Sequence, residues 1–536
     1  MSGIVVVGSG ASGVHFALTA LRKGHAVTMV DVGRDARTVT MPDATLPQLK
    51  DRLEDPVDYF LGKQFEGVLL PDLDQEYYGI PPHKQYVFEV PRDFRVATSG
   101  FHPLFSFAQG GLAEAWTAGC YPLNDQELAA FPFSYDTLGP HYSEVARRIG
   151  ITGVDDDLAR FLPLHDHLLE PLRLDAHSAS LLAVYARKRR RLNERLRCFV
   201  GRTRVATLSR DHGERHGCGY LGRCLWGCPV EALYTPSQTL CECRTFSGFT
   251  YIGGVQAQHF ILDAGRRATG LVVAPVDGGP HQTVPVERLV LAAGTLSSTR
   301  IVLRSIYEAT GETIQLGGLM DNRQLLVPFL NLRMLGKRFV PESYQYHLLG
   351  MGIETGEPQE YIHGQITTLK TALMHPIIQR LPLDLRSALL LARATHAALG
   401  VVNVNLHDTR RTENHVTLAP GDDRAPSRLA IRYAPAAHEP VVIRRALGLV
   451  KRALWELGCI VPPGMVHVRP MGASVHYAGT LPMKQGSAPW TTDANCRSRD
   501  VENLWVVDGS TFPFLPAKNI TFTLMANAVR VAESAF

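Results

Sequence analysis

The first thirty-one residues have the order strand, glycine turn, helix and strand, which few folds accommodate. The apolar run Ile4-Val5-Val6-Val7 leads directly into Gly8-Ser9-Gly10-Ala11-Ser12-Gly13, and residues 14–21 have the spacing of an apolar helix. A second apolar run, 26–30, ends in Asp31. In a βαβ unit of this kind the glycines let a pyrophosphate approach the helix N-terminus, and the acidic residue accepts hydrogen bonds from a ribose. We therefore predict a dinucleotide site formed by Gly8, Gly10, Ala11, Ser12, Gly13 and Asp31.

Length and composition indicate a globular protein of several structural units. The 536 residues are too many for one ordinary domain, and the hydrophobic fraction of 45% with 20% charged residues is typical of a globular enzyme. The 55 basic and 51 acidic residues leave a formal charge of only +4. A charge this small does not predict a nucleic-acid partner.

The N-terminus and the apolar tracts bear on the cellular compartment. Met1-Ser2-Gly3 enters the first strand at once, without the charged and apolar regions of a signal peptide, so we expect cytoplasmic residence. The longest apolar tract, 388–405, is interrupted by Arg393, Thr395 and His396, so no transmembrane segment is predicted.

A second turn-and-helix signal lies near the C-terminus. The apolar run 504–507 is followed by Asp508-Gly509-Ser510, and Asn519 precedes a further apolar segment. This order predicts a strand, a turn and a helix N-terminus, which presents backbone N–H groups and a positive dipole end to a ligand.

Three stretches between these ends carry weaker signals. Residues 36–95 show no sustained period and predict a long excursion that covers the cofactor site. The paired glycines Gly110 and Gly111 before Trp116 suggest close backbone approach to a flat ligand. The basic run 187–191 is interpreted as the solvated face of a helix, with a patch for an anionic substrate or a membrane surface as the alternative.

Three of the nine cysteines, Cys218, Cys224 and Cys228, lie close together in the sequence. Clusters of cysteine and histidine can hold zinc or an iron–sulfur group, but these spacings match neither paired CxxC ligands nor a ferredoxin run. Structural thiols or one local disulfide are favoured, with a metal site as the alternative. No metal ligand is predicted elsewhere in the chain.

Several motifs together resemble the glucose-methanol-choline (GMC) family of FAD-dependent oxidoreductases. Gly110-Gly111, the segment Phe131 to Tyr142 and Val475-His476-Tyr477-Ala478-Gly479-Thr480 each match a family motif. The segment 110–117, Gly-Gly-Leu-Ala-Glu-Ala-Trp-Thr, is most similar to pyranose oxidases, which carry a flavin-linked histidine where this chain has Ala115. An alanine cannot form that bond, so the resemblance implies non-covalent FAD.

The resemblance also implies an architecture. It predicts an α/β fold with a Rossmann-type FAD-binding domain, arranged as in GMC proteins and p-hydroxybenzoate hydroxylase, and a substrate-binding cap of antiparallel sheet plus helices. The FAD-binding domain would comprise 1–35, 96–150, 200–320 and 466–536, and the cap 151–199 and 321–465. Implied cofactor contacts beyond the N-terminal turn are Gly110, Gly111, Val255, Ala293, Gly294, Asp508, Gly509 and Ile520.

The reaction implied is oxidation of an alcohol. His476 matches the family's catalytic base, and Asn519 matches its second catalytic position, which would hold the substrate oxygen. A histidine suits this role because its pKa lies near working pH. The implied substrate is a sugar, glycoside or polyol, and oxygen or another acceptor would reoxidise the flavin. His467, in a predicted strand, is a competing histidine that we interpret as structural.

Three alternatives to this function remain open. The first is a redox-neutral flavoprotein of the same family, such as a hydroxynitrile lyase, in which His476 would act as acid and base alone. The second is a non-catalytic flavin-binding protein. The third is an NAD-dependent dehydrogenase, since the N-terminal fingerprint does not distinguish NAD from FAD.

Overall fold

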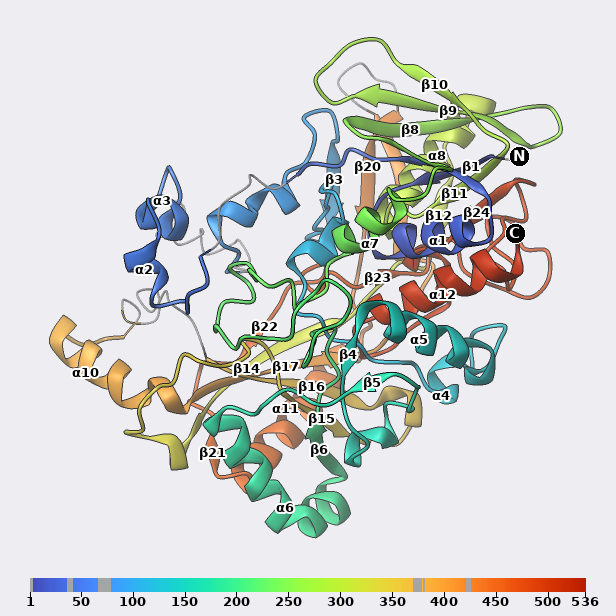
Figure 1. Ribbon diagram of the computed structural model, residues 1–536. Coiled ribbons are helices and arrows are strands. Elements are labelled where there is room, and N and C mark those ends of the chain that lie inside the picture. The colour runs from blue at the N-terminus through green and yellow to red at the C-terminus, as the bar shows by residue number, and fades with distance from the viewer. Residues whose placement is uncertain (1–2, 36–41, 66–78, 370–377, 379–380, 421–425) are drawn as a thin grey trace.

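The computed structural model describes residues 3–35, 42–65, 79–369, 378, 381–420 and 426–536, and it contains two large sheets (Figure 1). The first sheet is parallel and has the strand order β24-β11-β1-β2-β7. Its strands are β1 (Gly3–Val7), β2 (Ala26–Val30), β7 (Phe249–Ile252), β11 (Arg288–Leu291) and β24 (Leu504–Val506). The sheet is therefore assembled from segments that lie hundreds of residues apart.

Both faces of the parallel sheet are covered, which explains why β1 is apolar at every position after Gly3. Ile4 and Val6 pack into a core with helices α1 and α12, whereas Val5 and Val7 pack into a second core with helix α8. Adjacent residues of a strand point to opposite faces, so a sheet buried on both sides needs a continuous apolar run. The helices concerned are α1 (Ala11–Arg22), α5 (Tyr135–Ile149), α7 (Pro236–Cys243), α8 (Thr295–Thr310) and α12 (Thr521–Ser534).

Two smaller sheets adjoin the α8 side. One is an antiparallel meander of β8 (Val255–Leu262), β9 (Ala268–Pro275) and β10 (Gln282–Pro285), which the apolar alternation of this region predicts. The other has the order β12-β19-β20-β3, with β3 (Val96–Ser99), β12 (Gln315–Gly317), β19 (His415–Pro420) and β20 (Pro426–Arg432).

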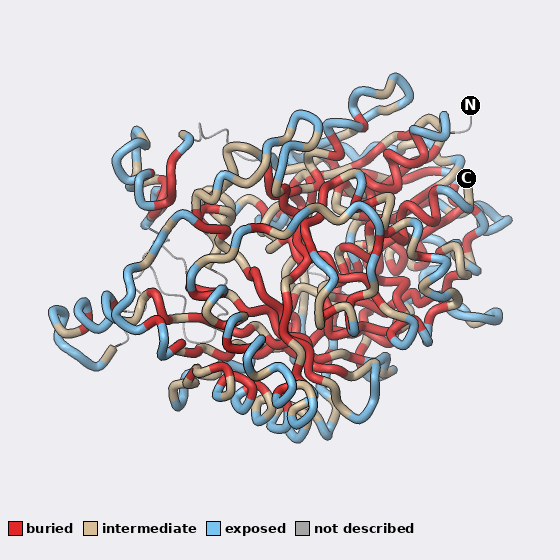
Figure 2. Tube along the Cα trace, turned by 60° about the horizontal axis from the view of Figure 1, so that its bottom comes forward, coloured by how far each residue is buried: buried red, intermediate tan, exposed pale blue. Residues whose placement is uncertain are grey.

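The second large sheet has seven strands and is antiparallel. Its order is β21-β14-β17-β16-β15-β6, with β22 also pairing with β14. The strands are β6 (Cys198–Arg202), β14 (Arg323–Asn331), β15 (Leu349–Ile353), β16 (Ile362–Thr368), β17 (Leu399–Leu406), β21 (Cys459–Ile460) and β22 (His467–Val468). Figure 2 shows buried residues gathered in the interior of the molecule and exposed residues along its outer loops and helices.

The antiparallel sheet has an apolar face and a polar face. Val402 and Val404 of β17 pack with helices α6 (Ala176–Leu196) and α11 (Glu439–Glu456), which cover the apolar face. Asn403 and Asn405 alternate with these valines and therefore point to the opposite face. That polar face lies toward the C-terminal segment, because Gln365 of β16 donates a hydrogen bond to Asn519.

Shorter elements connect the sheets. They are α2 (Leu49–Arg52), α3 (Pro56–Leu61), α4 (Asp125–Leu128), α10 (Leu385–Thr395), β4 (Ile151–Thr152), β5 (Leu168–Leu169), β13 (Met320–Asp321), β18 (Asp408–Thr409), β23 (Tyr477–Ala478) and β25 (Phe514–Leu515). Short 3₁₀ turns lie at η1 (Pro82–Phe88), η2 (Gly111–Ala115), η3 (Asp157–Arg160), η4 (Leu332–Met334), η5 (Pro358–Glu360), η6 (His396–Ala398) and η7 (Gly509–Thr511).

The arrangement confirms the predicted α/β class, with a parallel Rossmann-type sheet and an antiparallel sheet. Parts of the predicted 36–95 excursion, 36–41 and 66–78, lie outside the described residues. The division into two domains stays a prediction, because β19 and β20 from the predicted cap segment pair with β12 and β3.

The structure places the basic run on helix α6, where most of its charges have acidic partners. Lys188 and Arg191 both contact Glu456, and Arg189 contacts Asp157. These pairs favour the interpretation of a solvated helix face over an anion-binding patch.

The predicted apolar tract and the cysteines are also placed by the structure. Residues 388–405 are divided between α10 and β17, and none of the described helices is long and apolar enough to cross a bilayer. All nine cysteines are free thiols. Among the described residues, no three His, Cys, Asp or Glu side chains are grouped as a metal site would require.

A buried ion pair fastens the segment before α12 to helix α4. The Lys518 amine, which is fully buried, contacts the Glu127 carboxylate at 2.5 Å and donates to the carbonyls of Pro122 and Phe161 at 2.8 and 2.6 Å. Removing one partner of such a pair leaves an uncompensated buried charge.

We therefore expect Lys518→Met to destabilise the protein by ~3–5 kcal/mol, and the double variant Glu127→Gln/Lys518→Met to recover much of that loss. Urea unfolding of both variants measures the shift in midpoint. The exposed pair Arg190–Glu194 provides a control, since Glu194→Gln should change stability by less than ~1 kcal/mol. Equal stability of the single and double Lys518 variants would contradict this account.

Candidate active site

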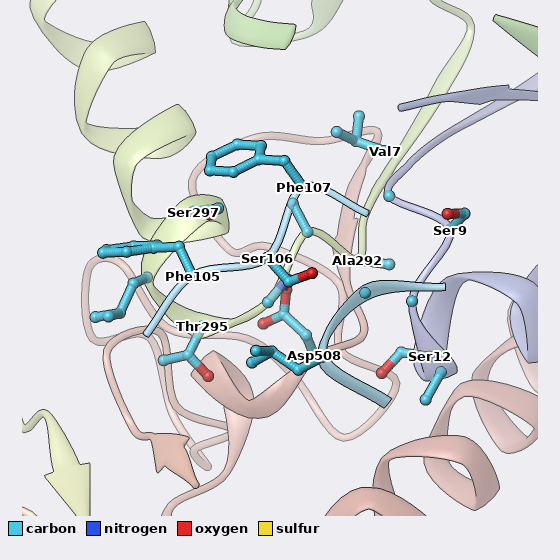
Figure 3. A pocket seen from close by; sticks show the side chains of 18 of the residues that line it. Val7, Ser9, Ser12, Phe105, Ser106, Phe107, Ala292, Thr295, Ser297 and Asp508 are labelled. Atoms are coloured by element: carbon cyan, nitrogen blue, oxygen red, sulfur yellow. The ribbon is translucent and has the colours of Figure 1, made fainter. Parts of the chain in front are cut away.

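A cavity opens where the parallel sheet, the α8 turn and the C-terminal segment meet. Figure 3 shows that its wall includes Ser9 and Ser12 from the N-terminal turn, Phe105 to Phe107, Thr295 and Asp508. The predicted site residues that line it are Gly8, Gly10, Ala11, Ser12, Asp31, Gly110, Gly111, Val255, Ala293, Gly294, His476, Asp508, Gly509 and Ile520. Gly13 and Asn519 are the predicted site residues that do not line it.

The N-terminal glycines explain how the backbone can surround a ligand here. Gly8 has φ +100°, and a Cβ on it would lie 2.7 Å from the Ala292 carbonyl oxygen. A Cβ on Gly13 would lie 2.0 Å from the Gly8 carbonyl oxygen. Gly13 therefore permits α1 to pack against β1, and its contribution to the site is indirect, as is typical of the third glycine of this fingerprint.

Three helix N-termini reach the cavity. Ala11 and Ser12 begin α1, Thr295 begins α8, and Thr521 begins α12, and all four residues line the cavity wall. The first turns of these three helices contain no acidic residue. Their free N–H groups and positive dipole ends favour a ligand that carries negative charge, such as a pyrophosphate.

Asp31 lies at the end of β2 in a small hydrogen-bond network. Its carboxylate accepts a hydrogen bond from the Ser9 hydroxyl and another from the Tyr251 hydroxyl at 3.2 Å. Burial raises the pKa of Asp31 to about 6, against the opposing effect of these two hydroxyls. The Gly110 amide in turn donates to the Ser9 hydroxyl at 3.0 Å, so one serine joins the acidic residue to the Gly110–Gly111 loop.

Asp508 fixes the shape of the opposite wall. Its carboxylate accepts hydrogen bonds from the Ser298 hydroxyl at 2.5 Å, from the Gly294 amide at 3.1 Å and from the Ser510 hydroxyl at 2.6 Å. The acid thereby ties the η7 turn to the beginning of α8. The carboxylate forms these hydrogen bonds with protein groups, and it shapes the cavity by holding the backbone of the two turns in position.

His476 lines the same cavity from the segment after Ser474. Its Nδ1 lies 3.1 Å from Oδ1 of Asn322, a buried residue immediately before β14. Burial, followed by the charge of Arg469, lowers the pKa of His476 to about 4. The preceding residue, Val475, has φ +66°, a backbone conformation that β-branched residues rarely adopt. Such strain is typical of functional positions whose surroundings hold them in place.

Tyr477, the residue after His476, has a structural role. Its hydroxyl donates to the Gly472 carbonyl at 2.5 Å and accepts from the Leu104 amide at 2.9 Å. The side chain therefore holds two loops together beside His476. His467, the competing histidine, lies exposed on the short strand β22.

Asn519 lies close to the polar face of the antiparallel sheet. Its Oδ1 accepts a hydrogen bond from Nε2 of Gln365. Asn322 connects this segment with His476, because its amide nitrogen donates to the Pro516 carbonyl at 2.8 Å while its oxygen faces the imidazole. The two predicted catalytic residues are thus joined through Asn322 and the segment 516–519.

The polar face presents several buried groups that have no hydrogen-bond partner among the described residues. They include Nε2 of His347, Nε2 of His363 and Nδ2 of Asn405. Burial lowers the pKa of both histidines to about 3, so they are neutral. Gln324 accepts from Arg469 and donates to Oδ1 of Asn405 at 3.0 Å, which leaves the Asn405 amide nitrogen as an available donor. Buried polar groups are normally paired, so such a set indicates a place for a polar ligand or water.

Sequence reasoning missed Asn322, Ser9 and Tyr251 as parts of the site. Ser9 stands at a variable position of the glycine fingerprint, and Tyr251 and Asn322 make their contacts with residues more than 150 positions away. The alternation Val402-Asn403-Val404-Asn405 does carry a readable signal, since polar residues at every second position of a strand mark one polar face.

Comparison with known proteins agrees with this description. Residues 410–528 match the family model of GMC oxidoreductases. A GMC-type oxidoreductase of Sinorhizobium fredii is 40% identical over 62 residues, a match that spans 12% of this chain and 12% of that protein.

Two solved structures share the fold over nearly the whole chain. Pyridoxine 4-oxidase from Mesorbium loti has a TM-score of 0.60 at 17% identity and covers 99% of both chains. An FAD-dependent oxidoreductase from Chaetomium thermophilum has a TM-score of 0.57 at 12% identity, covering 99% of this chain and 98% of that one. Residues 410–528 are therefore similar to GMC oxidoreductases, and the chain as a whole shares the fold of these two solved structures.

Proposed function

We propose that this protein binds FAD without a covalent link and oxidises an alcohol group of a small neutral substrate, with His476 as the base. The observation that carries the proposal is that the His476 imidazole lines the same cavity as the glycine fingerprint and Asp31. A dinucleotide held at the fingerprint and a proton acceptor in the same cavity are the two components that alcohol oxidation requires.

The cavity wall suits FAD. The N-termini of α1 and α8 and the glycines at 8, 10, 110 and 111 would hold the pyrophosphate and flavin, with Asp31 at the ribose and Val255 near the adenine. The N-terminus of α12 would face the ring, where positive potential favours the reduced form. Ala115 has no nucleophilic atom, which supports a non-covalent cofactor.

The protein side chains would act on the substrate hydroxyl. His476 is neutral at physiological pH and accepts the hydroxyl proton, while Asn519 holds the same oxygen by a hydrogen bond. When bound, FAD supplies the acceptor for the hydride that leaves the carbon. The carbon–oxygen bond becomes a carbonyl, and the two electrons pass on to oxygen or another acceptor.

The substrate class is proposed from the polar face of the antiparallel sheet. Neutral imidazoles at His347 and His363 and the amide of Asn405 offer hydrogen bonds without a charge. This supports a sugar, glycoside or polyol, the class that the segment 110–117 suggested. The name of one similar structure, pyridoxine 4-oxidase, adds a heteroaromatic alcohol to the compounds worth screening.

The proposal is tested by anaerobic reduction of the yellow protein with sugars, polyols, glycosides and pyridoxine. A substrate should bleach the flavin absorbance, and His476→Ala should slow bleaching by ~10²–10⁴-fold because a positioned general base contributes about that much. His467→Ala, an exposed histidine on β22, is the matched control and should bleach at the wild-type rate. Bleaching of His476→Ala at the wild-type rate would disprove the assignment. If no compound bleaches the flavin but lyase turnover is found, the redox-neutral alternative holds.

The lowered pKa of His476 predicts the acidic limit of the reaction. A free histidine would lose its basic form below pH ~6.5, whereas His476 stays neutral until the pH falls through about 4. The flavin reduction rate at low substrate concentration should therefore be flat from pH 7 to about pH 5 and fall tenfold per unit below about pH 4. A decline centred near pH 6.5 would contradict the lowered pKa.

Cofactor identity is checked by precipitating the purified protein with acid. Non-covalent FAD leaves a yellow supernatant and a colourless pellet. A pellet that stays yellow after repeated washing would contradict the absence of a covalent bond. A colourless protein that binds NAD would favour the dehydrogenase alternative.

A further inference from the structure

Asn322 is oriented by contacts that use both of its amide hydrogens. Its Nδ2 donates to the Leu406 carbonyl at 2.9 Å and to the Pro516 carbonyl at 2.8 Å. The reverse orientation would place the amide oxygen against two carbonyl oxygens. Because Asn322 is only 1% exposed, water cannot relieve that repulsion. The side-chain oxygen must therefore be the atom that faces His476.

This orientation determines which histidine nitrogen carries the proton. Nδ1 of His476 lies 3.1 Å from the Asn322 oxygen, and an amide oxygen only accepts hydrogen bonds. Nδ1 must therefore be the donor. In a neutral imidazole one nitrogen is protonated and the other has a lone pair, so the lone pair is on Nε2.

We propose that Asn322 is a positioning residue that holds His476 in the Nδ1–H tautomer, so that Nε2 is the atom that accepts the substrate proton. Histidine free in water favours the opposite tautomer, with the proton on Nε2, which offers no lone pair at that position. The inference deepens the proposed function, because it specifies the atom of the base and the group that keeps it available.

Further hydrogen bonds hold the segment that carries His476 beside Asn322. Asp321, the residue before it, accepts hydrogen bonds from the Gly472 amide at 2.5 Å and from the Ser474 hydroxyl. Ser474 in turn accepts from the His476 amide at 3.0 Å. Two consecutive residues of the chain therefore hold the backbone and the ring of the same segment.

Nitrogen NMR of the FAD-loaded protein labelled with ¹⁵N-histidine tests the proposal without any substrate. The His476 signals are identified by their loss in His476→Gln. In the wild type we expect the proton on Nδ1. In Asn322→Ala we expect it to shift largely to Nε2. Asn322→Asp keeps an acceptor toward Nδ1 when its other oxygen is protonated and faces the Leu406 and Pro516 carbonyls, so this variant should retain the histidine proton on Nδ1. A proton on Nε2 in the wild type would overturn the proposal.

The matched control is Asn331→Ala, which removes a buried asparagine from the other end of β14. Asn331 caps a short turn by accepting from the Arg333 amide at 3.1 Å, and its loss should leave the His476 tautomer unchanged. If Asn322→Ala keeps the wild-type tautomer, the inference fails. If Asn322→Ala does not fold, the wild-type spectrum and Asn322→Asp still decide the question.

The flavin reduction rate gives a second readout. Asn322→Ala should slow reduction by ~10²–10⁴-fold at unchanged FAD content, since a wrong tautomer removes the base. Asn322→Asp should restore much of the rate. If Asn322→Ala changes the His476 tautomer but reduces the flavin at the wild-type rate, the role of Asn322 in fixing the tautomer is supported. The assignment of His476 as the base is then wrong. The two proposals therefore fail in distinguishable ways.

Discussion

The close contact between α1 and β1 is the constraint on which the site depends. The Gly8 carbonyl lies where a side chain on Gly13 would stand, so only glycine lets the helix approach the strand. This approach brings the N-terminus of α1 to the carboxyl edge of the sheet, where β11 and β24 also end. The turns that follow those two strands, at Gly294 and Asp508, are joined by one hydrogen bond, and the cavity forms between the three.

The parts of the structure that could be predicted are those encoded locally. The βαβ unit is predictable because strand, glycines, helix and acidic residue follow each other within thirty-one positions. The Asp508 turn is predictable for the same reason. That this turn contributes to a cofactor site was predicted only from the resemblance to GMC proteins. The polar face of the antiparallel sheet was not predictable in this way, because that sheet draws strands from residues 198 to 468 and its polar residues meet only after folding.

Asn322 illustrates why a residue that acts by orienting another site residue escapes sequence analysis. It follows Asp321 in a segment for which no site residue was predicted, and its partner His476 lies 154 positions away. The residues next to an asparagine in the sequence do not determine which way its side-chain amide faces. That information comes from the carbonyls of Leu406 and Pro516, which belong to two further segments. The direction of the hydrogen bond between Asn322 and His476 is thus determined only in the assembled fold.

The parallel sheet has a consequence for the order in which the protein becomes functional. Its strand order places β24, from residues 504–506, beside β11, and β11 beside β1 at the start of the chain. Contacts between such distant segments slow folding, because the chain must close long loops first. A ribosome-bound chain would expose the glycine turn early, yet one wall of the cavity would be missing until β24 and α12 emerge. The cavity is therefore completed late in folding, and a ligand that contacts all of its walls would bind only to a chain that has completed its fold.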